Sequence, residues 1–267
     1  MPRKNRVCSD TGVYHVMLRG INHQIIFETS NDYLKLLQLL HQKCYPKDSD
    51  GKAMPACCAV YAYCLMPNHI HLLIQEKDEK ISDTIKSIGI AYAQYYNIKY
   101  DHSGHLFQDR FRSEPVNDWE YFVTLLRYIH QNPVAGGIVH RVKDYIWSSW
   151  GEFEKTDVCP ISVCSIKSVL SKISYPALEE LVNEPLPKAQ RILDYNNETS
   201  KRISEDVIRD YLLSECGVEN IKDIQGYPKE KRDELLIKMW KFGASARQIV
   251  RMTGVSERII RKLTRQQ

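Results

Sequence analysis

Two spacings of apolar residues divide the chain into predicted strands and helices. Residues 13–19 are mostly apolar, aromatic or β-branched, and they predict a first strand that ends at Gly20. Apolar residues then recur at every third or fourth position up to Lys43. This spacing predicts a helix, which Asn31 or Asp32 is expected to cap.

A pair of strands and a second helix follow. Residues 56–66 and 69–74 predict two strands, and Pro67 and Asn68 between them predict the tight turn of an antiparallel hairpin. Ser82 is expected to cap the next helix. The side chains predicted on one face of that helix are Ile85, Ile88, Ala91, Tyr92 and Tyr95.

A short strand over residues 111–116 and a third helix complete the pattern. Asp118 is expected to cap this helix. The helix is expected to reach about residue 131, because Pro133 and Gly136 follow and would stop it. The order strand, helix, strand, strand, helix, strand, helix is typical of a ferredoxin-like α+β fold. A single antiparallel sheet backed by helices would leave its other face free.

The chain from about residue 203 onward is predicted to be all-α. Residues 246–252 and 256–263 predict two helices joined by a short turn at Gly254, with Ser256 as the second N-cap. This pattern is typical of a helix-turn-helix, although an ordinary helical hairpin would look the same. The outward-facing basic residues, which favour DNA binding, are Arg258, Arg261, Lys262 and Arg265.

These patterns predict three regions. Residues 1–150 form the α+β domain, residues 151–202 form a helical or irregular connector, and residues 203–267 form the C-terminal helical domain. The connector contains several prolines, and residues 195–200 have the composition of a linker.

The composition is that of a globular protein with an uneven distribution of charge. Hydrophobic residues make up 43% of the chain, which suffices for a core, and the formal net charge is +4. Residues 222–267 hold twelve Lys or Arg and five Asp or Glu, whereas residues 151–200 hold five and eight. A basic terminal segment indicates a polyanionic partner such as nucleic acid, although solvated helix faces have a similar composition.

Membrane and secretory classes are not indicated. No charged-then-apolar leader opens the chain, and no apolar run approaches the ~20 residues that span a bilayer. The chain has eight cysteines and no CxxC motif, and we interpret these cysteines as reduced thiols. We therefore expect a cytoplasmic protein without a membrane partner.

The predicted strand at residues 69–74 carries the most informative chemistry. His69 and His71 are two residues apart, so they share one face, while Ile70, Leu72 and Ile74 face the core. Two neutral imidazoles at this spacing suit one divalent cation. Two partly exposed strand histidines without a metal are the alternative.

The third helix contains a tyrosine and an amide on one face. Tyr128 and Asn132 are four residues apart. A phenol beside a metal-bound phosphate is a plausible nucleophile, and the Asn132 amide oxygen suits a hard ion such as Mg²⁺ or Mn²⁺. With sixteen tyrosines in the chain, a packed aromatic is the alternative for Tyr128.

Four motifs in one order resemble the REP-associated tyrosine transposases, which are single-tyrosine HUH transposases of single-stranded DNA. The resemblance covers about residues 10–150, and its motifs are Tyr14–Gly20, Met66–Leu73, Gly104–Phe111 and Arg127–Val134. It implies that residues 1–150 form an HUH catalytic domain, that His69 and His71 hold a divalent metal, that Asn132 completes the site and that Tyr128 is the nucleophile.

Other residues compete for the nucleophile or for contacts with DNA. Tyr121 lies two helical turns before Tyr128 and is its chief rival, whereas Tyr92, Tyr95 and Tyr96 are expected to pack or to stack on bases. Basic residues around the loop before the last strand are candidates for phosphate contacts, although exposed charge is the alternative for each: His102, His105, Arg110 and Arg112.

The resemblance and the residues together predict a metal-dependent endonuclease and strand transferase that forms a 5′-phosphotyrosine on hairpin or repeat single-stranded DNA. Its partners would be single-stranded or hairpin DNA, and duplex DNA through the C-terminal region, with the protein a monomer or a homodimer. A non-catalytic DNA-binding regulator is the first alternative. An RNA-binding ferredoxin-like sheet is the second, but it leaves the paired histidines unexplained.

Overall fold

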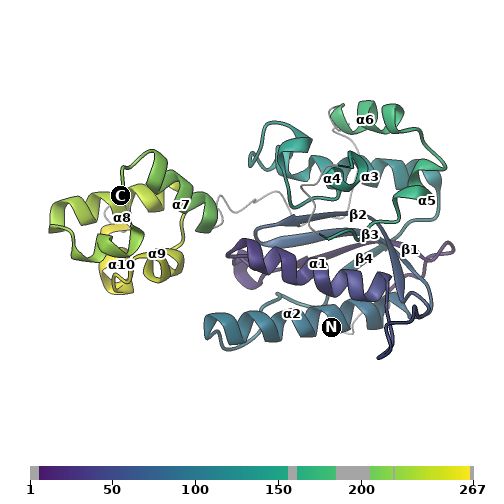
Figure 1. Cartoon of the computed structure of the whole chain (residues 1–267), viewed down its shortest axis with the longest axis horizontal. Helices are drawn as coiled ribbons and strands as arrows, with labels where there is room; N and C mark the ends of the chain where they lie inside the picture. Colours follow the sequence, from purple (N-terminus) through teal and green to yellow (C-terminus); the bar gives the residue numbers. More distant parts are fainter. Residues whose placement is uncertain (1–5, 156–160, 185–204, 219, 265–267) are drawn as a thin grey trace. The chain divides into compact units, whose positions relative to one another are not determined.

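The computed structural model describes residues 6–155, 161–184, 205–218 and 220–264 (Figure 1). The chain divides into two compact units. The first comprises residues 1–26 and 31–199, and the second comprises residues 27–30 and 200–267. Among the described residues, no helix is both long and apolar enough to cross a membrane.

The first unit is built on a four-stranded antiparallel sheet. Its strands are β1 (Val13–Arg19), β2 (Cys58–Met66), β3 (His69–Glu76) and β4 (Arg112–Pro115), and they lie in the order β2-β3-β1-β4. Helices α1 (Ser30–Cys44) and α2 (Ile81–Tyr100) connect them. This order and connectivity confirm the ferredoxin-like fold.

Helices α1 and α2 cover one face of the sheet (Figure 1). Apolar side chains of both helices meet Leu18 of β1 and Ile70 and Leu72 of β3 there. Ile70, Leu72 and Ile74 are all buried, as the alternation along the strand predicted.

The second face of the sheet is not free, which corrects the prediction. Helix α3 (Trp119–Ala135) packs on it, and Leu125 and Ile129 share one hydrophobic core with Cys64 and Met66 of β2. The apolar stripe of α3 can be buried only against this face, because α1 and α2 occupy the other. His69 and His71 therefore lie between a sheet and a helix instead of facing solvent.

Three helix ends also differ from the sequence prediction. Helix α1 begins at Ser30, so the expected caps Asn31 and Asp32 lie inside it. Helix α2 begins at Ile81 instead of being capped by Ser82, and Ile81 N–H donates to the Glu76 carboxylate at 3.2 Å. Helix α3 continues through Pro133, which is buried in the last turn, and the Gly136 N–H closes it by donating to the Asn132 carbonyl. A proline in the final turn removes only one intrahelical hydrogen bond, so it does not end the helix.

The predicted start of α3 is confirmed. The Asp118 side chain accepts a hydrogen bond from the Tyr121 N–H at 2.7 Å. This cap fixes the point from which the helix runs across the sheet.

Three short helices from residue 150 onward join the core that α3 forms with the sheet in the first unit. They are α4 (Trp150–Phe153), α5 (Ile166–Leu170) and α6 (Tyr175–Asn183). Trp150, Val169 and Leu178 belong to the same core as the buried face of α3. The first unit therefore extends beyond the expected boundary at residue 150.

The second unit is helical. It contains α7 (Glu205–Ser214), α8 (Lys229–Phe242), α9 (Ala246–Thr253) and α10 (Glu257–Thr264) around one apolar core. Ser245 and Gln248 form a capping box at the start of α9. Gly254 ends α9 in the left-handed conformation, with φ of 74°, so the two predicted helices and the turn between them are present. The predicted linker at residues 195–200 lies outside the described residues.

Candidate active site

His69 and His71 project from β3 toward α3. Both are buried, and their ring centroids lie 4.9 Å apart at nearly a right angle. Nδ1 of His69 donates to Oδ1 of Asn68, in the turn between β2 and β3, at 2.7 Å. The hydrogen bond to Asn68 therefore fixes the orientation of the His69 ring.

The Asn132 amide lies between the Nε2 atoms of these two histidines. Its Oδ1 is 3.3 Å from Nε2 of His69, and its Nδ2 is 3.4 Å from Nε2 of His71. The helix-borne amide and the strand histidines thus converge, as the sequence predicted.

Tyr128 lies one turn before Asn132 on α3 and is 8% exposed. The edge of its ring faces His71, with ring centroids 5.4 Å apart and an interplanar angle of 88°. The structure therefore brings all four of the expected residues together: His69, His71, Tyr128 and Asn132.

His15 on β1 belongs to the same cluster, and the sequence analysis did not single it out. It is fully buried, its Nε2 lies 3.1 Å from Nδ1 of His71, and the two rings stack with centroids 5.3 Å apart. It also meets the edge of the Tyr128 ring, with centroids 6.0 Å apart. The signal that could have found it is a polar residue in an otherwise apolar strand, but its partner depends on strand register, which the sequence does not show.

Burial keeps the clustered histidines neutral. It lowers the pKa of His69 to about 4, that of His15 to about 3 and that of His71 well below its ordinary value. Neutral imidazoles retain a nitrogen lone pair at physiological pH, which is the form that binds metal ions.

The donor set fits a divalent cation. Nδ1 of His69 carries the proton, so its Nε2 presents a lone pair to Asn132. If Nδ1 of His71 carries the proton as well, both Nε2 atoms present lone pairs to Asn132, whose amide can donate to only one of them. In either orientation of the amide, its oxygen then faces the Nε2 lone pair of the other histidine, which is an unfavourable contact. A cation bound by the amide oxygen and the two Nε2 atoms would make the arrangement favourable. Within the described part of the chain, no three His, Cys, Asp or Glu side chains form a metal-binding group, so the Asn132 amide is the third candidate donor here.

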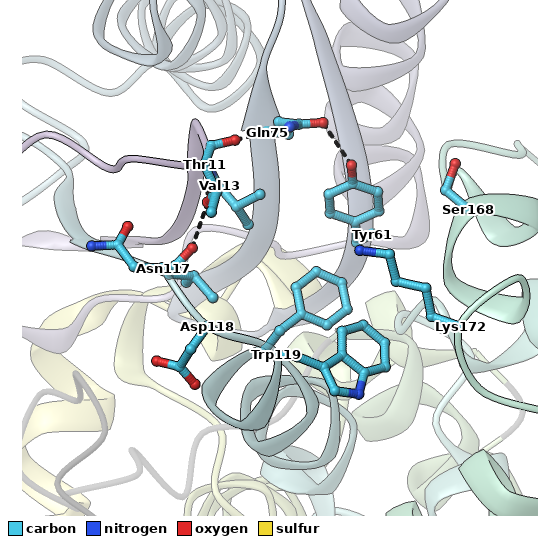
Figure 2. Close-up of a pocket in the computed structure, with 11 residues that line it drawn as sticks. Thr11, Val13, Tyr61, Gln75, Asn117, Asp118, Trp119, Ser168 and Lys172 are labelled. Carbon is cyan, nitrogen blue, oxygen red and sulfur yellow. Dashed lines mark hydrogen bonds between the residues drawn. The ribbon is translucent and has the colours of Figure 1, made fainter.

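A pocket lies at the opposite end of α3, beside its first turn (Figure 2). Trp119 and Phe122 stack there with centroids 5.1 Å apart, and the ammonium of Lys172 is 5.3 Å from the centroid of the Trp119 ring. Two polar side chains of its wall bond to each other, since the Tyr61 hydroxyl donates to Gln75 at 2.6 Å. Trp119 begins α3 and Asn132 lies near its end, so this pocket is separate from the histidine cluster.

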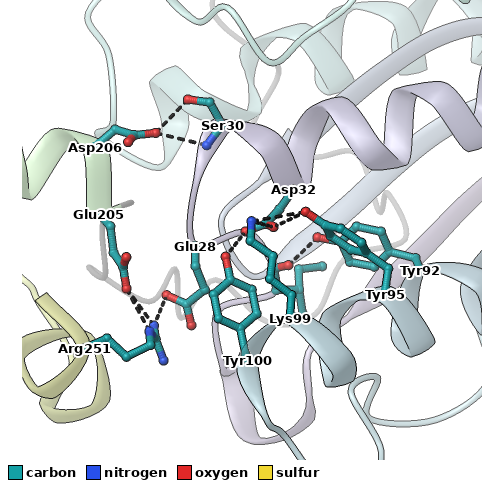
Figure 3. A network of polar contacts seen from close by, with 11 residues as sticks. Glu28, Ser30, Asp32, Tyr92, Tyr95, Lys99, Tyr100, Glu205, Asp206 and Arg251 are labelled. Atoms are coloured by element: carbon teal, nitrogen blue, oxygen red, sulfur yellow. Dashed lines mark hydrogen bonds and ion pairs between the residues drawn. The ribbon is translucent and has the colours of Figure 1, made fainter.

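The tyrosines of α2 lie on the other face of the sheet. The Tyr92 hydroxyl donates to the Ile26 carbonyl at 2.5 Å, and the Tyr95 hydroxyl donates to the buried carboxylate of Asp32 at 3.0 Å (Figure 3). Lys99 and Tyr100 donate to the same carboxylate. Tyr92, Tyr95 and Tyr96 are thus packed in structural positions and do not enter the cluster.

The basic residues before β4 are exposed. They include His105 and Arg110, and Arg112 at the start of β4 is exposed as well. His102 is partly buried beside Asn97. Met17 of β1 pairs with Arg112 on one side and with His71 on the other, so Arg112 shares the sheet face of the histidines. Arg6, which the sequence analysis missed, stacks 3.7 Å from the Phe111 ring centroid and adds a guanidinium beside Arg110.

The basic residues of α10 are exposed in the second unit. Arg258 and Lys262 lie on its surface, and Arg261 forms a 2.7 Å ion pair with Glu257. Arg265 lies outside the described residues.

Comparisons with known proteins bear on the first unit. Residues 8–132 match the family model for IS200-like transposases. A REP-associated tyrosine transposase of Haemophilus influenzae is 32% identical over 111 residues, which span 37% of this chain and 62% of that protein. The expected resemblance is thereby confirmed.

A solved structure is also similar to this chain. It is that of a REP-associated tyrosine transposase bound to a REP hairpin, at 16% sequence identity and a TM-score of 0.48. The match covers 73% of this chain and 96% of that one.

Proposed function

We propose, from the match of residues 8–132 to the IS200-like transposase family, that this chain nicks and rejoins single-stranded DNA through a covalent tyrosine intermediate. The observation that carries the proposal is the convergence of His69, His71 and Asn132 beside Tyr128. The residues that the resemblance implies are the ones that this geometry brings together.

The proposed nucleophile is the Tyr128 hydroxyl. Its oxygen attacks a phosphodiester phosphorus, the new bond joins tyrosine to the 5′-phosphate, and the bond to the 3′-oxygen breaks. The phenol proton is lost to solvent or base, and the departing strand gains a 3′-hydroxyl. A 3′-hydroxyl can later attack the phosphotyrosine and release Tyr128, so strand exchange needs no nucleotide triphosphate.

His69, His71 and Asn132 would hold Mg²⁺ or Mn²⁺, with Asn132 contributing its amide oxygen. A divalent cation bound there would polarise the phosphoryl oxygen and offset the charge that develops on it. The chain itself supplies the orientation, because Asn68 fixes the His69 ring and α3 carries both Tyr128 and Asn132.

The second unit is proposed to bind duplex DNA. Its helix-turn-helix places exposed Arg258 and Lys262 on α10, where a recognition helix would meet the major groove. The catalytic unit would then be brought to folded single-stranded ends near the bound duplex.

The test uses labelled single-stranded oligonucleotides that contain a hairpin with flanking sequence of varied composition. The full chain is incubated with them and Mg²⁺ or Mn²⁺, and a denaturing gel separates protein from DNA. A slow-migrating covalent adduct that requires the cation is expected. If no oligonucleotide of the library yields an adduct while several are bound, the non-catalytic regulator becomes the better assignment.

A further inference from the structure

We infer that His15 is a positioning residue that fixes the tautomer of His71, so that Nε2 of His71 carries a lone pair toward the metal site. The inference rests on the proposed function, because it gives His15 a role toward the cation that His69, His71 and Asn132 would hold.

The two proposed metal ligands are held by the same device. Nδ1 of His69 donates to Oδ1 of Asn68 at 2.7 Å, which leaves Nε2 of His69 without a proton. Nδ1 of His71 meets Nε2 of His15 at 3.1 Å. In both rings Nδ1 contacts a neighbouring side chain outside the proposed metal site, and Nε2 is directed to Asn132.

The contact between His15 and His71 allows two proton arrangements, and only one suits metal binding. If His15 carries its proton on Nδ1, its Nε2 accepts from Nδ1–H of His71, and Nε2 of His71 is free to bind a cation. If His15 carries its proton on Nε2, it donates to Nδ1 of His71. The remaining proton of His71 then sits on Nε2 and blocks the site.

Packing alone does not account for a histidine at this position. His15 is fully buried, and its Nδ1 has no hydrogen-bond partner among the described residues. A buried polar atom left in this state costs about 1–3 kcal/mol. An apolar side chain would fill the site without that cost, so the contact with His71 is the feature that requires an imidazole.

Partners of this kind are a general feature of metal sites, where the second ring nitrogen of a ligating histidine usually donates to an acceptor that fixes its orientation. A carboxylate or carbonyl is the common acceptor. Here the acceptor is a neutral imidazole, which orients His71 without adding a negative charge next to the site.

The direct test is the tautomer of His71 in the metal-free full chain. Nitrogen-15 and carbon-13 shifts of the imidazole distinguish a proton on Nδ1 from one on Nε2. The inference predicts the Nδ1–H form for His71 and for His15. An Nε2–H form of His71 would overturn it, and this readout needs neither DNA nor activity.

A pair of variants tests the consequence for metal binding. His15→Leu removes the acceptor, whereas His15→Gln places an amide oxygen at about the reach of Nε2. Titration calorimetry with Mn²⁺ alone should show affinity about 10- to 100-fold weaker for His15→Leu and largely restored for His15→Gln. If His15 had a merely structural role, the Mn²⁺ affinity of each variant would fall in proportion to its loss of stability. Equal Mn²⁺ affinity in the wild type and both variants would also contradict the inference.

Failure of the proposed function would look different. In that case the wild-type chain would not bind Mn²⁺ at all, while the tautomer measurement would still decide the role of His15. If His15→Leu fails to fold, the spectra of the wild-type chain and the Mn²⁺ affinity of His15→Gln still test the inference.

Discussion

The Tyr121 hydroxyl donates a 2.6 Å hydrogen bond to the carboxylate of Glu114 on β4. Burial and this carboxylate raise the pKa of Tyr121 well above its ordinary value, so its phenolate form is strongly disfavoured. Tyr128, seven residues later on α3, has its ring beside His71 instead. Tyr128, the predicted nucleophile, and Tyr121, its chief rival, therefore lie in different electrostatic settings.

Tyr128→Phe should fold and bind DNA but form no covalent adduct, because only the attacking oxygen is removed. Tyr121→Phe should retain substantial adduct and serves as the matched control, since it deletes the same atom on the same helix. Mass spectrometry of peptides from the trapped adduct provides the direct measurement. Nucleotide recovered on the peptide containing Tyr121 would contradict the assignment.

Replacing His69 or His71 with alanine should abolish cleavage, because each is proposed to supply one of two nitrogen ligands to the cation. A chelator should abolish the activity of the wild-type chain, and added Mn²⁺ should restore it. Circular dichroism is expected to show a folded protein in each variant. Cleavage by the double variant at the wild-type rate, with the same dependence on metal, would exclude these residues as ligands.

Much of the fold could be predicted from local sequence. The alternation in β3, the turn at Pro67 and Asn68, and the cap at Asp118 are local signals, and the ferredoxin-like order follows from the series of elements they mark. Spacing likewise predicts that His69 and His71 share one face of a strand and that Tyr128 and Asn132 share one face of a helix. That these two faces meet was implied by the resemblance, not by the spacing.

The rest of the site depends on contacts between distant segments. His15 meets His71 only through the register of β1 against β3, and Tyr121 differs from Tyr128 only because Glu114 lies opposite it. The covering of the histidine face by α3 was missed for the same reason. Periodicity shows that a helix has an apolar stripe but not which side of the sheet buries it.

Arg258→Gln combined with Lys262→Gln should weaken binding to duplex DNA and lower its salt dependence. Each lost phosphate contact should reduce the slope of log affinity against log salt by about 0.9. Lys222→Gln, which removes one exposed charge outside the helix-turn-helix, is the control and should change the slope less. Fluorescence anisotropy at several salt concentrations measures both. An unchanged slope in the double variant would exclude α10 as the DNA-binding element.

His130 should make the folded state less stable as the pH falls. It is fully buried and bonds to the Leu126 carbonyl and the Ser149 hydroxyl, and burial lowers its pKa from 6.5 to about 4. Between these values the unfolded chain binds a proton that the folded chain does not, so stability is lost as the pH drops from 6.5 to 4. The contribution of this group reaches about 3 kcal/mol.

The measurement is the free energy of unfolding in urea at several pH values. His130→Gln cannot take up this proton, so its stability should fall less steeply between pH 6.5 and 4. His140→Gln, at an exposed histidine, is the matched control and should follow the wild-type slope. A His130→Gln profile parallel to that of the wild type would contradict the prediction.

Gly20→Ala should destabilise the first unit and disturb the histidine cluster. A Cβ at Gly20 would lie 2.2 Å from the Gln24 carbonyl oxygen, and backbone cannot yield as a flexible side chain can. The Gly20 N–H also donates to the Asn68 carbonyl at 2.9 Å, so a shift here moves the residue that orients His69. We expect a loss of about 1–3 kcal/mol in the free energy of unfolding, together with weaker Mn²⁺ affinity.

Gly89→Ala is the informative control, because its expected effect has the opposite sign. Gly89 lies inside α2, and a Cβ there would be 3.7 Å from the Leu18 side chain, which is ordinary van der Waals contact. Alanine in a helix interior is favoured over glycine by about 1 kcal/mol, so this variant should be more stable than the wild type. Urea unfolding of the wild type and the two variants measures these differences. If Gly20→Ala is as stable as the wild type, the backbone after β1 can shift to accept a Cβ at Gly20. The close contact between Gly20 and Gln24 would then not be what holds Asn68 in place.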